Sequence, residues 1–445
     1  MRIDIQNKTG GVLILVMALV VAIGLTGAGL MGLGTGSGIE VSYGVNDANA
    51  FEMAQAGLER FRAIIRTNSM PLNLVGPGYL GNNVLTNLSS KGRYAVSTEA
   101  WPGWNNNTSY QGFKYKVTSV GVSVGGSLRS LTMCATLPRF PSFMHASNYE
   151  KLVNGQRIFF LPGDEIDGKI YSNDQINVDG SSNPKPRFLQ QVFSAASSVY
   201  YQNGANSSVF MGGLNLNAAP ISGQFVGQNI TDIKTKAESL QGGLYGISLV
   251  GTNAGDYNVI FTNISNVGYV RYAKVGSTNF TSRTLSSMNG AIYINGDATV
   301  QGVVNGNVTL AAQDTIFITN GITYASATSP NPWQTNFVNS AVDDSLGLLA
   351  SNAVTVLSKT SINIHAAIMV TSGDGGFGAP NWNTTVATPR PNIYLFGSLA
   401  QYRRGLVSQG ASYGFNKKYK FDARYETFSP PYFPLLVYQF SYWGQ

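Results

Sequence analysis

The sequence of 445 residues predicts an α+β N-terminal part, made of a long helix and a small antiparallel sheet, followed by a mainly-β domain. A run without any charged residue extends from Gly10 to Gly38, and apolar residues then recur every three or four positions as far as Ile65. These features predict one N-terminal helix that is transmembrane at its start and amphipathic at its end. From about Arg157 onward, short β-branched runs alternate with Gly, Asn and Asp, which predicts a β-solenoid with insertions.

The composition excludes several classes of protein. Only 11% of the residues are charged and the net charge is +7, whereas an ordinary soluble domain has about 25% charged residues. A highly charged cytosolic enzyme surface and charge-driven disorder are therefore not expected. The single cysteine, Cys134, excludes an internal disulfide and a cysteine-based zinc or iron–sulfur site.

The uncharged run predicts a membrane span. It is longer than the ~20 apolar residues that cross a bilayer, and the basic residues Arg2 and Lys8 precede it. Because basic residues stay on the cytoplasmic side, we expect a single-pass protein of a bacterial inner membrane whose remainder faces outward. A cleaved secretory signal, with a shorter apolar stretch of ~7–15 residues, is the alternative.

Three further regions follow the predicted helix of residues 11–67. Alternating apolar residues in 93–98, 113–124 and 131–137, with Gly125-Gly126 as a turn, predict a small antiparallel sheet within 68–138. Residues 139–445 form the predicted solenoid, with an inserted block at about 181–288. A β-sandwich is the alternative fold for this domain. The positions predicted to face inward include Ile166, Ile170, Ile176, Val178, Ile292, Ile294, Val300, Val303, Val308, Leu310, Ile316, Ile318 and Ile322.

The N-terminus resembles type IV prepilin-like proteins. A short basic leader ends in Gly10 and Gly11 directly before the apolar run, and the stretch AQAGLER of Ala54 to Arg60 is similar to the AEAGL run of PilX-like minor pilins. The resemblance implies a pilin-like fold and removal of residues 1–10 by a prepilin peptidase, after Gly10 or Gly11. It also implies a filament-assembly helix, on which we expect contacts from Leu15, Phe51, Leu58 and Phe61.

One residue departs from the pilin pattern. Most pilins have glutamate as the fifth mature residue, whereas this chain has Leu15 or Val16 there, depending on the cleavage site. In the family, that glutamate is thought to neutralise the terminal amine of the preceding subunit. Its absence favours a position at the filament tip. The alternative is an anchored surface protein that never enters a filament.

The second half resembles an uncharacterised domain that occurs behind prepilin-like N-termini. The similar stretches are GAIYINGDATVQG, DDSLGLLA of Asp343 to Ala350, IHAAIM of Ile364 to Met369 and GSLAQYRRG of Gly397 to Gly405. A β-solenoid behind a pilin helix is also the architecture of a competence-associated tip pilin proposed to receive DNA. This resemblance adds DNA uptake to the expected functions.

A basic and aromatic segment between Arg390 and Glu426 contains most of the net charge. Cations that neutralise phosphates and rings that stack on bases are typical of grooves for single-stranded nucleic acid. The candidate polyanion-binding residues are Arg403, Arg404, Lys417, Lys418, Tyr419, Lys420 and Arg424. The alternative is a half-buried edge strand that lysines protect from pairing.

The sequence contains no recognisable catalytic or metal motif. The only histidines, His145 and His365, are not at metal-binding spacing, and the acidic pairs Asp343-Asp344 and Asp164-Glu165 are typical of turns, with calcium binding as the alternative. We therefore predict no catalytic residue, no metal and no cofactor.

These observations predict a non-enzymatic minor pilin or pseudopilin of a type IV pilus-like system, at the filament tip. The β-rich module would serve adhesion, or binding of DNA or another ligand, at the cell surface. The expected partners are the inner membrane before assembly, other pilins or pseudopilins, a prepilin peptidase, and DNA or a surface glycan or protein. The alternatives are a type II secretion pseudopilin, an N-terminally anchored surface adhesin and a glycan-cleaving surface hydrolase.

Overall fold

A computed structural model gives the fold of most of the chain. It describes residues 9–67, 86–100, 113–137, 142–218, 220, 228–338, 341–371, 374–380, 390–409, 413–426, 428–434 and 439–442. The chain forms two compact units. The helix unit contains residues 1–104, 114–135 and 440–445, and the strand unit contains residues 105–113 and 136–439.

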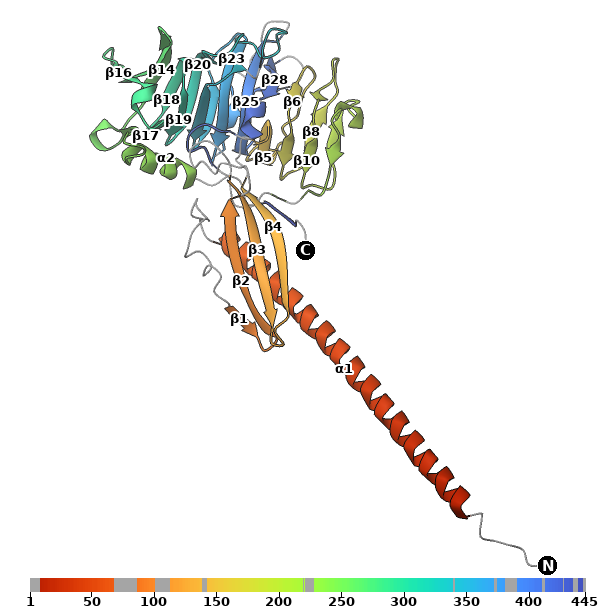
Figure 1. The fold of residues 1–445 in the computed structure, drawn as a ribbon. Helices are drawn as coiled ribbons and strands as arrows, with labels where there is room; N and C mark the ends of the chain where they lie inside the picture. The colour runs from red at the N-terminus through yellow and green to blue at the C-terminus, as the bar shows by residue number, and fades with distance from the viewer. Residues whose placement is uncertain are drawn as a thin grey trace, which may run out of the picture. The chain divides into compact units, whose positions relative to one another are not determined.

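The helix unit combines one helix with a five-stranded sheet (Figure 1). Helix α1 extends over Thr9–Thr67. The strands lie in the order β1-β2-β3-β4-β29, and β2 runs antiparallel to both β1 and β3. Their bounds are β1 (Thr86–Ser89), β2 (Gly92–Ala100), β3 (Phe113–Ser123), β4 (Leu128–Leu137) and β29 (Gln439–Tyr442).

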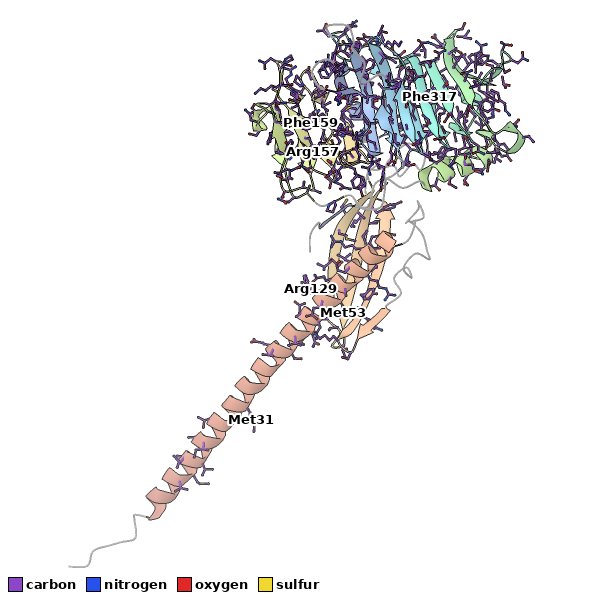
Figure 2. The ribbon with its side chains drawn as sticks, turned by 180° about the vertical axis from the view of Figure 1, so that it is seen from behind. Met31, Met53, Arg129, Arg157, Phe159 and Phe317 are labelled. Carbon is purple, nitrogen blue, oxygen red and sulfur yellow. The ribbon has the colours of Figure 1, made fainter. Side chains whose placement is uncertain are left out.

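The last third of α1 packs on the sheet through one face. Its buried residues, at helical spacing, are Ala50, Met53, Ala54, Leu58 and Phe61. Two glycines allow the close approach. A Cβ atom on Gly121 would lie 2.0 Å from the carbonyl oxygen of Ala50, and one on Gly57 would lie 2.2 Å from the Ser119 hydroxyl. Figure 2 labels Met53 where the helix meets the strands and Met31 on the length of helix before them.

The strand unit consists of many short strands and one further helix, α2 (Gln228–Glu238). Its first half contains β5 (His145–Tyr149), β6 (Glu165–Asp167), β7 (Ile170–Ser172), β8 (Asn177–Asp179), β9 (Arg187–Phe188), β10 (Val192–Ser194), β11 (Tyr200–Gln202), β12 (Leu214–Asn215), β13 (Ile247–Leu249), β14 (Tyr257–Ile264), β15 (Val267–Lys274) and β16 (Thr281–Thr284). Its second half contains β17 (Ala291–Ile294), β18 (Ala298–Val304), β19 (Asn307–Ala312), β20 (Thr315–Tyr324), β21 (Ser345–Ala350), β22 (Ala353–Val356), β23 (Ile362–Val370), β24 (Gly376–Gly378), β25 (Asn392–Arg403), β26 (Ser408–Gln409), β27 (Tyr413–Gly414) and β28 (Asn416–Phe421). Short 3₁₀ turns lie at Ser207–Val209, Gly251–Asn253, Leu285–Ser287 and Ala423–Glu426.

Twenty of these strands form one mixed sheet, in which most neighbours that are distant along the chain pair in parallel. The chain enters this sheet in its interior, because β5 lies between β7 and β25. From β5 the strands β7, β10 and β12 follow in one direction. The chain then continues at β13 and returns through β17, β19, β21, β23 and β25. The first and the last strands of the unit therefore meet where β5 and β6 pair with β25 and β28, a contact that we call the junction.

A stack of side chains in register fills the centre of this sheet. Its members, in spatial order, are Ile247, Ile292, Leu310, Leu348, Ile368, Leu399, His145, Ile170, Val192 and Leu214. Burial of such aliphatic ladders from rung to rung is the main stabilising interaction of stacked-strand folds. The single polar member, His145, lies at the junction.

The structure corrects the predicted fold class. Large mixed sheets of strands dominate the described residues, and among these residues no helix, α1 included, is long and apolar enough to cross a bilayer. The predicted α+β pilin-like fold with a transmembrane helix is therefore wrong. The single-pass location in a bacterial inner membrane is corrected by the same finding. Residues 181–288, expected as an inserted block, instead contribute strands such as β9, β10 and β14 to the twenty-stranded sheet.

Candidate functional site

The candidate polyanion segment lies inside the strand unit. Strand β28 alternates between half-buried and buried residues, so that Lys417, Tyr419 and Phe421 point inward while Lys418 and Lys420 point outward. Only 4% of Lys417 and 1% of Tyr419 are exposed. Arg404, which follows β25, is 1% exposed. Two of the predicted cations and the predicted stacking ring therefore cannot reach a polyanion.

The other basic side chains of the segment have partners within the chain. The Lys418 ammonium lies 3.0 Å from Glu165, and the Arg424 guanidinium lies 2.5 Å from Asp422. Lys420 donates to the carbonyl oxygen of Pro332 at 2.9 Å, and Arg403 donates to that of Lys151 at 2.9 Å. The structure thus does not bring the seven predicted residues together as an open basic groove. The carboxylates that neutralise several of them come from distant parts of the sequence.

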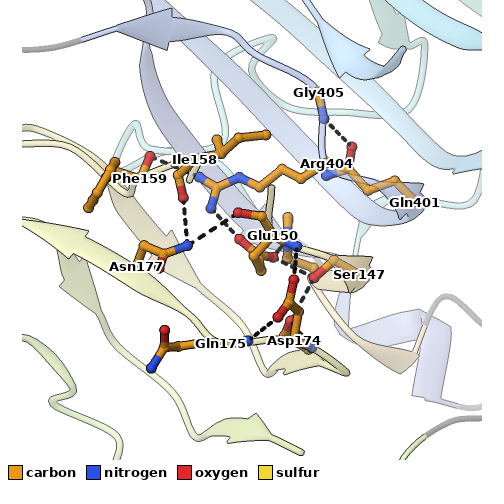
Figure 3. Close-up of polar contacts among 12 residues, drawn as sticks. Ser147, Glu150, Ile158, Phe159, Asp174, Gln175, Asn177, Gln401, Arg404 and Gly405 are labelled. Carbon is orange, nitrogen blue, oxygen red and sulfur yellow. Dashed lines mark hydrogen bonds and ion pairs between the residues drawn. The ribbon is translucent and has the colours of Figure 1, made fainter. Parts of the chain in front are cut away.

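The junction contains a buried cluster of polar side chains, which Figure 3 shows in close-up. The Arg404 guanidinium donates to the carboxylate of Glu150 at 2.6 Å and to the carbonyl oxygen of Phe159 at 3.2 Å. Ser147 also contacts the Glu150 carboxylate, and His145 Nε2 lies 3.3 Å from it. A second buried pair joins Lys417 to Asp164 at 2.6 Å.

Burial and charge shift the pKa values of this cluster. Burial alone would raise the pKa of Glu150, but the charge of Arg404 and the hydrogen bonds from His145 and Ser147 outweigh it and lower the pKa to about 2. Burial lowers the pKa of His145, in spite of the neighbouring carboxylate. Burial also lowers the pKa of Lys417, to about 8, although Asp164 opposes the shift. At neutral pH the Glu150–Arg404 pair is therefore ionic and His145 is neutral.

The junction cluster holds the fold together and has no access to a substrate. His145 and Glu150 are 2% and 1% exposed, and Ser147 is fully buried. The Glu150 carboxylate is bound by Arg404 and Ser147. The Ser147 hydroxyl contacts this carboxylate and is not oriented by a histidine base. His365 is likewise structural, since its Nδ1 accepts from the Tyr324 amide at 3.1 Å and its Nε2 lies 2.8 Å from the carbonyl oxygen of Pro330.

The acidic turn residues are also occupied by contacts within the chain. Asp344 accepts bonds from the amide and hydroxyl of Ser326, and Asp164 accepts from Leu161 and Lys417. Over the described ranges, no group of three or more His, Cys, Asp and Glu residues is arranged to hold a metal ion.

The residues expected to mediate filament assembly divide into different environments. Gly10 and Gly11 lie in the first turn of α1, and Leu15 follows in the same helix, with a side chain outside the described part. Phe51 is 36% exposed. Leu58 and Phe61, by contrast, are buried against the sheet of their own helix unit. They cannot contact another subunit, because the strands of their own unit cover the apolar face of the helix to which they belong.

The early part of α1 exposes apolar side chains that its own unit does not cover. They are 49–77% exposed. The set is Val16, Met17, Leu19, Val20, Val21, Ile23, Leu25 and Met31. The sequence pattern predicted a membrane span for this stretch, which the described residues do not support, and the exposure of these side chains is a finding of the structure.

A pocket of ≈ 760 Å³ lies in the strand unit, among the turns before β19 and after β14, the 3₁₀ turn Leu285–Ser287 and the segment around Tyr432. We call it the amide pocket, because several Asn and Gln side chains line it. The lining residues are Gln241, Gly242, Leu244, Asn266, Val267, Gly268, Leu285, Ser286, Met288, Asn289, Gly290, Asn305, Gly306, Asn307 and Tyr432. This pocket was not predicted, because Asn and Gly residues between short strands indicate turns and carry no signal of a binding site.

Comparison of the chain with protein-family models, curated proteins and solved structures finds no match. The comparisons thus bring no support for a pilin family. The absence of a membrane-spanning helix from the described residues corrects the prediction of a transmembrane segment, whereas the resemblance to prepilins stays a prediction.

Proposed function

We propose that this chain is a non-enzymatic assembly subunit, in which α1 packs among helices of other subunits while the strand unit serves as a displayed binding module. The observation that carries this proposal is the exposed apolar surface of α1. Large apolar patches on a protein surface mark sites that another molecule covers.

The distribution of the exposed residues indicates how many neighbours α1 needs. Successive residues of an α-helix are turned by about 100°. Val16, Met17, Leu19, Val20 and Val21 are all exposed and therefore point in several directions around the axis. One partner helix covers a single stripe, so a helix that is apolar all round requires several neighbours. A bundle of helices of the same kind, including α1 of other copies, would provide them.

The helix is suited to close packing. Small residues are frequent in its first half, for example at Gly24, Gly27, Ala28 and Gly32. Such residues let helix backbones approach each other. A pilus-like filament built around apolar helices is the kind of assembly that this arrangement would serve, and other pilin-like subunits are the proposed partners.

The strand unit supports a binding role better than catalysis. Its buried ionisable cluster has no route for a substrate, whereas the amide pocket is open to ligands and has a volume typical of small-molecule sites, about 300–1,000 Å³. The glycan-cleaving alternative would need paired carboxylates beside the scissile bond. No acidic side chain is among the described residues that line the amide pocket.

Cysteine cross-linking tests the assembly proposal. The native Cys134 is buried, with 5% exposure, so a maleimide will react with a newly introduced cysteine first. Val21→Cys, at a 60% exposed position of α1, should give cross-linked dimers and higher species with a short bifunctional maleimide.

The matched control is Met211→Cys, which is 63% exposed on the strand unit. It should give no cross-linked species under the same conditions. Equal cross-linking of both variants, or of neither, would contradict a specific helix assembly.

A further inference from the structure

We infer that the amide pocket binds an uncharged oligosaccharide. The inference rests on the proposed display function only in assuming that the strand unit is available to a ligand. Its foundation is the chemistry of the pocket itself.

The first observation is the absence of charge from the lining. Among the described residues, none of the side chains that line the pocket belongs to Asp, Glu, Lys, Arg or His. In a chain of net charge +7, a pocket for phosphate, sulfate or nucleic acid would be expected to contain cations. The Lys236 ammonium lies 5.8 Å from the centre of the Tyr432 ring and Arg283 donates to the carbonyl oxygen of Ser287 at 3.0 Å, but neither side chain lines the pocket. The ligand is therefore expected to be neutral.

The second observation is a fixed pair of side-chain amides, Asn305 on the turn between β18 and β19 and Asn307 at the start of β19. The side-chain nitrogen Nδ2 of Asn305 donates to Oδ1 of Asn263 at 2.9 Å. The side-chain oxygen Oδ1 of Asn307 accepts from the Ser345 hydroxyl at 2.7 Å. These bonds orient both side chains. Within the described structure, the side-chain oxygen Oδ1 of Asn305 and the side-chain nitrogen Nδ2 of Asn307 have no hydrogen-bond partner. The pair thus offers one acceptor and one donor.

A hydroxyl group can donate and accept at the same time. Neighbouring hydroxyls on a sugar ring therefore match a neighbouring acceptor and donor, as presented by Asn305 and Asn307. A site built to bind hydroxyl groups also rejects analogues that lack them, because its polar groups would then stay unpaired.

The third observation is the combination of a ring and an apolar base. Tyr432 lines one part of the pocket, and the buried side chains of Leu285 and Met288 line another. Sugar rings have apolar C–H faces as well as hydroxyl edges, and an aromatic ring provides a flat contact area for such a face at low entropic cost. Amides, ring and apolar base together favour an oligosaccharide over a purely apolar ligand.

The test uses the full-length protein and three uncharged trisaccharides as probes, namely maltotriose, cellotriose and triacetylchitotriose. Binding is measured by ligand-observed NMR. We expect at least one probe to bind with a dissociation constant below about 1 mM. Tyr432→Ala, which removes the ring, and Asn307→Asp, which keeps an acceptor for Ser345 but removes the donor, should each weaken binding at least about tenfold.

Two matched substitutions outside the pocket serve as controls. Tyr413 is 38% exposed and Asn279 is also exposed. Tyr413→Ala and Asn279→Asp should leave the affinity unchanged. The circular dichroism spectrum and melting temperature of each variant show whether it is folded.

Three results would overturn the inference. These are no binding of any of the three neutral trisaccharides, tighter binding of a sulfated trisaccharide that is measured alongside them, and binding that folded pocket variants leave unchanged. The assembly proposal has a separate readout, since the cross-linking of Val21→Cys does not depend on a saccharide.

Discussion

Arg404 and Glu150, which are 254 residues apart in the sequence, form a buried ion pair of 2.6 Å at the junction of the first and last strands of the strand unit. The Arg404 guanidinium also lies 3.7 Å from the centre of the Phe160 ring. The pair links the residue that follows β25 to the residue that follows β5. Because β25 and β5 are parallel neighbours, the pair can set the register in which the two halves of the unit meet.

Removing one member of this pair should destabilise the protein strongly. Arg404→Met leaves the Glu150 carboxylate buried without its cation, and loss of one partner of a buried pair costs about 3–5 kcal/mol. The double variant Glu150→Gln/Arg404→Met should recover part of the loss, because no uncompensated charge remains. Urea unfolding followed by circular dichroism measures both effects.

An exposed ion pair provides the control for this series. Lys151 is 45% exposed where it meets Asp174 at 3.4 Å. Lys151→Met should change the free energy of unfolding by less than about 1 kcal/mol. If Arg404→Met lowers the free energy of unfolding by as little as Lys151→Met does, the structural role of the junction is refuted.

The junction also predicts a loss of stability in acid. The pKa of Glu150 is about 2 in the folded protein and near 4.5 when unperturbed. Protons therefore bind more readily to the unfolded chain, so that stability present above pH 4.5 is lost as the pH falls toward 2. The pKa of His145 is lowered as well, so the unfolded chain also binds the histidine proton more readily. Protonation of His145 therefore lowers the stability further as the pH falls below 6.5. The loss from Glu150 is on the order of 3 kcal/mol.

Melting temperatures between neutral pH and the acid limit test this prediction. The wild-type protein should lose stability steeply in the acid range. Glu150→Gln should be less stable at neutral pH and show a shallower decline. Parallel curves for the two proteins would show that Glu150 is not the group responsible.

Replacement by alanine should lower the stability of the helix unit at one glycine of α1 and raise it at another. A Cβ atom at Gly57 would meet Ser119 and Tyr94 on the sheet, whereas nothing lies within 4 Å of one at Gly44. Gly57→Ala should destabilise the helix unit by about 1–3 kcal/mol through overpacking. Gly44→Ala should stabilise the helix by up to about 1 kcal/mol. The thermal loss of helical circular dichroism measures both; a stabilising Gly57→Ala would contradict the close contact.

The sequence indicated local structure well in the strand unit. Regular alternation of apolar residues gives the correct face for Ile292, Ile294 and Val300, which are buried. Val303 was predicted inward but is 37% exposed. The alternation in β18 is regular, with Ala298, Val300 and Val304 buried, so Val303 falls on the outward face and its assignment as an inward residue was wrong.

Long-range features were not accessible from the sequence. Lys417 and Arg404 look like exposed cations in a basic segment, because their partners Asp164 and Glu150 are about 250 residues away. The amide pocket likewise depends on turns from several strands. Only the topology, in which the chain enters the sheet in its interior, brings such segments together.

The size of the full-length protein in solution tests the assembly claim most directly. We predict that the wild-type chain sediments as assemblies of several copies, and that the triple variant Val16→Glu/Val20→Glu/Ile23→Glu sediments as a monomer with an unchanged strand unit. Three exposed apolar residues outside α1, Val124, Met211 and Val275, provide the control triple variant with glutamate, which should assemble like the wild type. A monomeric wild-type protein, or assemblies that survive the charges in α1, would contradict the account.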